Sequence, residues 1–237
     1  GRLDLIGSDT VPATLAVTST TTINNGITVT GDPVFNIAPG TTTTVNGVIA
    51  DGAMAGDVVV EGGGTLNLTA ANTYTGPTTV SAGTLNLTGS LASTAVTVAG
   101  GTLIDANGGL STSTNLTVNS GTANIDANQT IAHLNGTGGG VALASGKTLT
   151  VSAGGAYAGT ISGAGGLRVS GGTQTLSGDN TYTGGTEVDA GATLSISSAN
   201  ALGTGTLALV GTSTVSATLQ TTATMTVANA ITVKNDP

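Results

Sequence analysis

Short runs in which aliphatic and polar residues alternate recur along the chain. Examples are Leu66-Asn67-Leu68, Leu85-Asn86-Leu87, Val96-Thr97-Val98 and Leu149-Thr150-Val151. An alternation of period two places the aliphatic side chains on one side of a β-strand and the Thr or Asn side chains on the other. Clusters of Gly, Asn, Asp and Ser separate the runs and are typical of turns. The chain is therefore predicted to be all-β.

The strands and turns recur together as a unit of the form Gly-Thr-Leu-x-Leu, or a close variant of it. Its threonine falls at Thr65, Thr84, Thr102, Thr122, Thr148, Thr173 and Thr193. A loose period near twenty residues, with short strands and Gly-rich corners, predicts a parallel β-helix, which is a solenoid. Two intervals are longer than the rest, from Thr122 to Thr148 and from Thr148 to Thr173. Residues 128–146 and 154–172 are therefore expected to form protruding loops.

Chain length and composition agree with this prediction. At about twenty residues per coil, residues 1–237 give roughly eleven coils in one continuous rod about 50 Å long. Only 7% of the residues are charged and 2% are aromatic, whereas 39 are glycine. A narrow core built from Val, Ile, Leu and Ala needs no large aromatic anchors. Low charge and appreciable hydrophobicity exclude the usual disordered class, and glycine without a three-residue period excludes collagen.

Charge and cysteine content exclude several function classes. The formal net charge is −8, and the chain's four basic residues, Arg2, Lys147, Arg168 and Lys234, form no basic run. Nucleic acid is therefore not expected as a partner. The absence of cysteine excludes disulfides and thiolate metal sites. No run of 18 apolar residues occurs, and the first residues show no signal-peptide pattern. Because neither end has an obvious cap, the chain is expected to be a piece of a longer protein.

A five-residue box, Asn-Thr-Tyr-Thr-Gly, occurs at residues 72–76 and again at residues 180–184. The residues singled out in it are Asn72, Tyr74, Gly76, Asn180, Tyr182 and Gly184. The copies are about five coils apart, or roughly 25 Å along the axis, so they cannot form one site. We interpret the box as a structural part used twice. Its tyrosine is expected to lie over the neighbouring coil with the hydroxyl near water.

Two longer blocks, residues 57–87 and 165–196, match each other around the boxes. The second reads GGLRVSGGTQTLSGDNTYTGGTEVDAGATLSI. This pattern resembles the passenger-associated repeat of bacterial autotransporters. The first block departs from it at Asp57 and Val58, and has Pro77 where the repeat has glycine. With similar flanking segments, the repeat blocks extend to about 45–87 and 158–196.

The resemblance implies a right-handed parallel β-helix exported by type V secretion from a Gram-negative bacterium. The passenger would pass through its own C-terminal outer-membrane β-barrel, and would then stay at the cell surface or be released. The repeats would aid secretion and folding. Such passengers mostly mediate adhesion or autoaggregation. The expected partners are host-cell or neighbouring bacterial surfaces and other copies of the chain, and neither an enzymatic activity nor a cofactor is expected.

The alternative function is a β-helix that binds or degrades polysaccharide. Degradation would need several acids converging in a groove. Glu187 and Asp189 alternate on one predicted strand, so their carboxylates share a side about 7 Å apart, but the nearby sequence offers no cationic partner. The single histidine, His133, lies shortly after Asp126 in the sequence. We interpret His133 as an ordinary residue of a turn or strand.

Asp105 and Asp126 are weak candidates for a cation site. Both occur in Ile-Asp-Ala and are separated by one expected coil, so they could stack one coil above the other. An Asp that caps backbone amides of a turn is the favoured interpretation.

Ice binding is a lesser alternative. It would need Thr-x-Thr pairs in register on a flat face, and the pairs 28/30, 42/44, 148/150 and 224/226 are not expected to recur at every coil.

Overall fold

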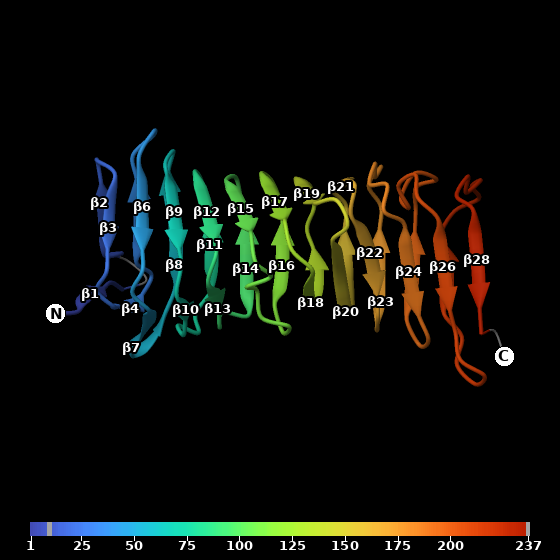
Figure 1. Ribbon diagram of the computed structural model, residues 1–237, viewed down its shortest axis with the longest axis horizontal. Coiled ribbons are helices and arrows are strands. Elements are labelled where there is room, and N and C mark those ends of the chain that lie inside the picture. Colours follow the sequence, from blue (N-terminus) through green and yellow to red (C-terminus); the bar gives the residue numbers. More distant parts are fainter. Residues whose placement is uncertain (9–10, 236–237) are drawn as a thin grey trace.

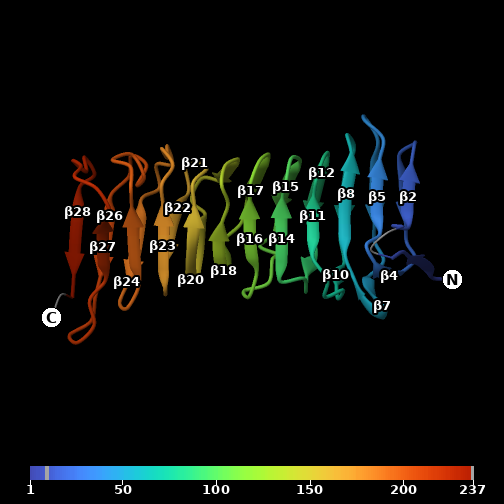
Figure 2. The same cartoon turned by 180° about the vertical axis from the view of Figure 1, so that it is seen from behind.

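The computed structural model describes residues 1–8 and 11–235, which form a rod of stacked strands with the termini at opposite ends (Figures 1 and 2). These residues contain 28 strands and no α-helix. Paired strands run parallel, as where β12 lies between β9 and β15. The fold is a parallel β-solenoid of about 12 turns, which confirms the predicted fold class and adds about one turn to the predicted number. The described residues contain no helix of the length and apolarity that crossing a bilayer requires.

The strands lie on three faces of the rod. Face 1 contains β2 (Thr14–Val17), β5 (Val34–Ile37), β8 (Val58–Gly62), β11 (Thr78–Val80), β14 (Ala95–Val98), β16 (Asn115–Val118), β23 (Thr173–Leu176), β25 (Thr193–Ile196) and β27 (Thr218–Thr221). Face 2 contains β3 (Thr21–Ile23), β6 (Thr42–Val45), β9 (Thr65–Leu68), β12 (Thr84–Leu87), β15 (Thr102–Asp105), β17 (Thr122–Ile125), β19 (Gly140–Leu143) and β21 (Thr160–Gly163). Face 3 contains β1 (Leu3–Ile6), β4 (Ile27–Gly31), β7 (Ile49–Gly56), β10 (Ala71–Asn72), β13 (Ser90–Leu91), β22 (Gly166–Val169), β24 (Thr186–Asp189), β26 (Leu207–Val210) and β28 (Ile231–Lys234).

Two long strands, β18 (Gln129–Asn135) and β20 (Thr148–Tyr157), turn a corner from face 3 to face 1. The start of β18 pairs with the start of β20, which in turn pairs with β22 on face 3. The end of β18 pairs with β16, and the end of β20 pairs with β23, both on face 1. Faces 1 and 3 are therefore joined into one sheet through these corners.

The core consists of aliphatic columns that follow the strand register. In β9 and β12, Leu66 and Leu68 stack on Leu85 and Leu87, and all four side chains are fully buried. The intervening residues alternate outward, as period two requires. In these strands every second residue is therefore a buried aliphatic side chain.

The prediction of protruding loops at residues 128–146 and 154–172 was wrong. Thr122 lies on face 2, whereas Thr148 lies on face 3 and Thr173 on face 1. The coil after Thr122 continues face 2 normally, with Gly140 paired to Thr122. Each long interval is therefore about one turn and a third, and the extra residues move the Gly-Thr-Leu unit to the next face.

Candidate functional surfaces

Face 2 presents two outward columns of uncharged side chains, most of them Thr or Asn. In register, one column contains Thr42, Thr65, Thr84, Thr102 and Thr122, and the other contains Thr44, Asn67, Asn86, Ile104 and Asn124. Among the described residues, no outward side chain of the eight face 2 strands is ionisable. The face is therefore a regular, neutral strip about 34 Å long, since successive strands lie about 4.8 Å apart.

Side-chain hydrogen bonds hold part of the second column in place. Asn86 donates from Nδ2 to Oδ1 of Asn67 over 3.1 Å, and Asn67 donates from Nδ2 to Oγ1 of Thr44 over 3.2 Å. The expectation that Thr-x-Thr pairs would not recur at every coil is confirmed for this face, because Thr42 and Thr44 are followed in register by Thr65 and Asn67 and then by Thr84 and Asn86. Two of the four Thr-x-Thr pairs considered from the sequence, 28/30 and 148/150, lie on face 3 and not on face 2.

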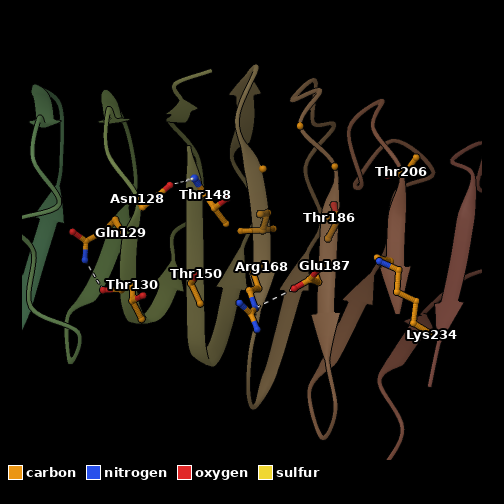
Figure 3. Close-up of a pocket in the computed structure, with 15 residues that line it drawn as sticks. Asn128, Gln129, Thr130, Thr148, Thr150, Arg168, Thr186, Glu187, Thr206 and Lys234 are labelled. Atoms are coloured by element: carbon orange, nitrogen blue, oxygen red, sulfur yellow. Dashed lines mark hydrogen bonds and ion pairs between the residues drawn. The ribbon is translucent and has the colours of Figure 1, made fainter. Parts of the chain in front are cut away.

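Face 3 contains a groove of about 580 Å³ that runs from β18 to β28 (Figure 3). Thr148 is paired with Gly166, and Gly185 accepts the hydrogen bond from the N–H of Leu167. The next coil places Thr206 beside Gly185. The row thus reads Thr148, Gly166, Gly185, Thr206, and its two central positions have no side chain. The bare backbone of these two glycines forms the floor of the groove.

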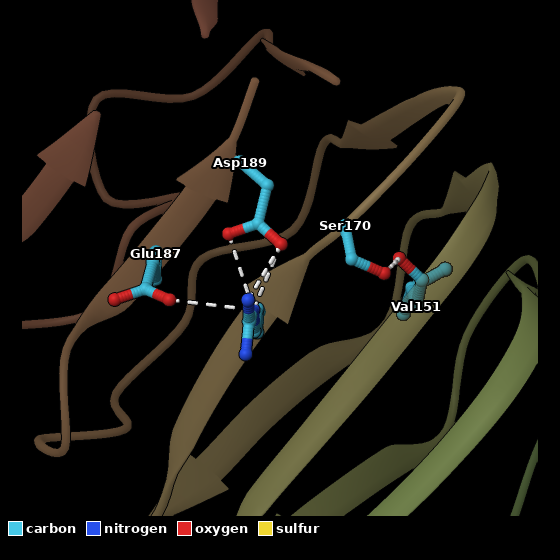
Figure 4. Close-up of polar contacts among 5 residues, drawn as sticks. Val151, Ser170, Glu187 and Asp189 are labelled. Carbon is cyan, nitrogen blue, oxygen red and sulfur yellow. Dashed lines mark hydrogen bonds and ion pairs between the residues drawn. The ribbon is translucent and has the colours of Figure 1, made fainter. Parts of the chain in front are cut away.

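An ion-pair cluster borders this floor (Figures 3 and 4). Arg168 Nη2 lies 2.8 Å from Asp189 Oδ2, and Arg168 Nε lies 3.3 Å from Glu187 Oε1. The hydrogen bond to Asp189 and the charges of both acids raise the pKa of the Arg168 guanidinium, against a smaller opposing effect of burial. The prediction that Glu187 and Asp189 share one side of a strand is confirmed. Their cationic partner was missed because Arg168 lies one coil earlier, where the register pairs it with Glu187.

Asp105 and Asp126 do not stack as the spacing had suggested. The register pairs Asp105 with Ile125, so Asp105 points inward and is fully buried, whereas Asp126 is exposed. Oδ1 of Asp105 accepts a 2.8 Å hydrogen bond from the N–H of Gly109, and its buried Oδ2 has no partner. Asp105 therefore caps a turn from within the core. The described residues contain no cluster of three or more His, Cys, Asp or Glu side chains arranged to hold a metal ion.

Replacing Asp105 by asparagine should change how stability depends on pH. Burial raises the pKa of Asp105 above its ordinary value, and hydrogen bonds from Gly109 and Gly108 only partly offset this. A raised folded-state pKa favours folding below the unfolded value of about 3.9, and this contribution is lost as the pH rises through the folded-state pKa. The Asp105→Asn variant keeps the Gly109 contact, and its side chain cannot ionise, so it does not lose stability in this way as the pH rises. In urea unfolding, its free energy of unfolding relative to wild type should therefore increase from pH 4 to pH 7, whereas Asp126→Asn should show no such trend; equal trends would contradict the assignment.

His133 lies on the face 1 part of β18, where it pairs with Asn115 and Gly154. Its side chain is half-buried, and within the described residues no hydrogen bond joins it to Asp126. The structure places His133 on a strand face, in agreement with the interpretation of an ordinary strand residue.

Both boxes hold their tyrosine inside the solenoid. Tyr74 and Tyr182 are fully buried, and their hydroxyls form hydrogen bonds with Oγ1 of Thr78 and Thr186. The expectation of a hydroxyl near water was therefore wrong. The signal that could have shown this is a threonine four residues after each tyrosine, present in both copies.

The box asparagine bridges three successive coils with its buried amide. Asn72 accepts the Ile49 N–H over 2.9 Å and donates to the Ser90 carbonyl over 3.2 Å. Asn180 makes the equivalent contacts with Ile161 and Ala201, each over 2.6 Å. The box is thus a cross-coil clamp.

The box glycines allow a close approach between coils. A Cβ at Gly76 or Gly184 would lie 2.5 Å from the carbonyl oxygen of Gly56 or Gly165 in the preceding coil. That distance is too short for any side chain, so glycine is required at both positions.

Comparison with known protein families identifies these two segments. The passenger-associated transport repeat matches residues 58–87 and 169–196. The chain carries this repeat twice. Together with the parallel β-solenoid, the repeats support an autotransporter passenger, as the sequence resemblance implied. No curated protein and no solved structure matches the chain.

The two passenger-associated transport repeats occupy different faces. The first places β8, β9 and its box on faces 1, 2 and 3, because Thr73 of the box bonds to Ile49 of β7. The second places the end of β22, β23 and its box on faces 3, 1 and 2, because Thr181 bonds to Ile161 of β21. The repeats are therefore related by a rotation of one face. The boxes lie about five and two-thirds turns apart, so they point in different directions.

The repeats also differ at one corner. Gly185 has a φ of +84°, whereas the first repeat has Pro77 at the matching position. Because proline holds φ near −65°, the two corners cannot share one backbone conformation.

Proposed function

We propose that this passenger is a non-enzymatic adhesin at the surface of a Gram-negative cell or released from it, and that it holds cells together by pairing with other copies of itself through face 2. The observation that supports this most strongly is the neutral strip of Thr and Asn columns on face 2. Host-cell surfaces are a further partner for the same polar faces.

Charge favours face 2 for contact between identical rods. Each chain carries a formal net charge of −8, so two copies repel each other at most orientations. Face 2 brings no ionisable outward side chain into a contact. Two copies can therefore approach there without opposing like charges directly.

The spacing of the columns also favours a second copy as the partner. Side chains repeat about every 4.8 Å along the rod, a distance set by the hydrogen bonds between strands. A partner with the same repeat, above all another copy, can match its polar groups to face 2 coil after coil. A partner with another spacing loses register within a few coils.

The size of face 2 predicts weak single contacts and strong collective ones. A strip about 34 Å long and one short strand wide offers on the order of 400 Å² per rod, about half of a standard protein interface. Isolated rods should therefore pair weakly. Many rods on two facing surfaces can bind together far more tightly through multivalency.

Two alternatives fit the surfaces less well. An ice-binding face needs two threonine columns, and the second column of face 2 contains Asn67, Asn86 and Asn124. A glycosidase needs carboxylates that converge on a substrate, whereas Glu187 and Asp189 both contact Arg168.

Aggregation of coated beads tests the proposal. Beads that carry the chain at high density should aggregate. Asn86→Glu should slow the initial rate of aggregation by about tenfold, because repulsion between like charges, about 1 kcal/mol per contact, acts at many contacts together. The matched control is Thr97→Glu on β14 of face 1, which gives the same net charge and should aggregate like wild type. Equal rates for the two variants, or wild-type beads that stay dispersed at every density, would contradict pairing through face 2.

A further inference from the structure

The groove on face 3 combines an open backbone floor with polar side chains on its borders. Gly166 and Gly185 leave the floor bare between Thr148 and Thr206, which lie three coils apart, or about 14 Å. The whole groove extends from β18 to β28, about 24 Å along the axis. Its shape suits an extended chain that lies along the rod, with one unit over the glycine floor.

Free hydrogen-bonding groups of both kinds border this floor. Within the described residues, Nη1 of Arg168 and Oε2 of Glu187 have no partner, although the remaining atoms of both groups take part in the ion-pair cluster. The side chains of Arg168 and Glu187 are 47% and 41% exposed, so they are accessible to a ligand. The ion pairs with Asp189 hold the guanidinium plane in position (Figure 4). The border thus offers a fixed donor beside a fixed acceptor.

The charges in and beside the groove cancel. Arg168, Lys234 and Glu187 line the groove, and Asp189 lies beside it in an ion pair with Arg168. An anionic chain would meet both carboxylates, and a cationic chain would meet the guanidinium and the ammonium group. A neutral chain of hydroxyl groups avoids both conflicts, because each hydroxyl can accept from Arg168 and donate to Glu187.

We infer that the groove on face 3 binds a neutral oligosaccharide in an extended conformation. Arg168 and Glu187 hold adjacent hydroxyl groups of the sugar that lies over Gly166 and Gly185. The hydroxyls of Thr148 and Thr206 contact the neighbouring sugars. This site is separate from the strip on face 2, and the inference does not depend on self-association.

An array of neutral and uronate-containing hexasaccharides tests this inference, followed by calorimetric titration of each hexasaccharide that binds. Wild type should bind at least one neutral hexasaccharide in preference to its uronate counterparts. Ala208→Trp fills the groove from the outer side of β26 and should abolish binding. The matched control is Ala142→Trp, at an outward position of β19 on face 2, which should bind like wild type.

A second variant covers the case in which tryptophan disturbs folding. Arg168→Lys keeps the charge but removes the planar donor, and should weaken binding by about tenfold or more while the circular dichroism spectrum stays that of wild type. Binding that is unaffected by Ala208→Trp and Arg168→Lys would overturn the inference. Preference for uronates or no binding to the array would also overturn it. The bead assay separates the two proposals, since Ala208→Trp should leave aggregation unchanged.

Discussion

Replacing Tyr182 by alanine is expected to lower the free energy of unfolding by about 3–5 kcal/mol, because it removes a large, fully buried side chain from the core. The cavity cannot be filled from the next coil. Gly203 lies against the ring there, and a Cβ at this glycine would be 3.0 Å from Cδ1 of Tyr182. Tyr74→Ala in the first repeat should have a similar effect, because Tyr74 is equally buried and has the equivalent threonine partner.

Tyr182→Phe separates the ring from the hydroxyl. It keeps the packing but leaves Oγ1 of Thr186 without its partner, so it should cost only about 1 kcal/mol. Burial raises the pKa of Tyr182 to about 12, against a smaller lowering by Thr186. The stability contributed by the neutral phenol is present below the unfolded pKa of about 10 and is lost as the pH rises through about 12. The phenylalanine variant should lack this part of the alkaline loss.

Urea unfolding measures the global effect, and hydrogen exchange shows where it acts. In a solenoid each coil contacts only its neighbours, so the loss should be concentrated in the coils around the substituted tyrosine. Faster exchange near β24 in Tyr182→Ala, with little change near β11, would agree with this. Equal losses for the alanine and phenylalanine variants would show that the ring does not carry the packing.

The sequence predicted the repeating coil but not the face of the solenoid on which each Gly-Thr-Leu unit lies. Alternating aliphatic residues and recurring Gly-Thr-Leu units were enough to predict a parallel solenoid of nearly the observed number of turns. The two long intervals on either side of Thr148 were misread, because a sequence interval does not show whether extra residues form a loop or continue onto the next face. That choice depends on which strand of the preceding coil is paired, as at β18 and β20.

The candidate surfaces were harder to predict for the same reason. Arg168 reaches Glu187 and Asp189 only because β22 and β24 are adjacent in register. Asp105 and Asp126 occur in identical short motifs, yet a pairing offset of one residue turns one inward and leaves the other exposed. In a solenoid, one residue of register decides whether a carboxylate is a surface group or part of the core.

Replacing Asn180 by aspartate should destabilise the solenoid at pH 7 by about 3 kcal/mol or more, because it introduces an unpaired buried charge. The side chain of Asn180 is nearly fully buried, and its Nδ2 donates to the Ala201 carbonyl. A carboxylate has no donor there, so its oxygen would face that carbonyl oxygen. The Oδ1 contact with the Ile161 N–H would remain.

Acid should partly rescue the Asn180→Asp variant. Burial without a donor raises the pKa of the new carboxyl in the folded state above its unfolded value of about 3.9. The variant is therefore most stable, relative to wild type, below that value, where a protonated carboxyl can donate to Ala201, and it loses stability as the pH rises through the folded-state pKa. Urea unfolding from pH 4 to pH 8 measures this trend.

Asn67→Asp, on the outer side of face 2, is the matched control and should cost little stability at any pH. If Asn72→Asp in the first repeat follows the same pH dependence, the box acts as one clamp used on two different faces; a flat profile in both variants would mean that the amide donor does not hold the coils together.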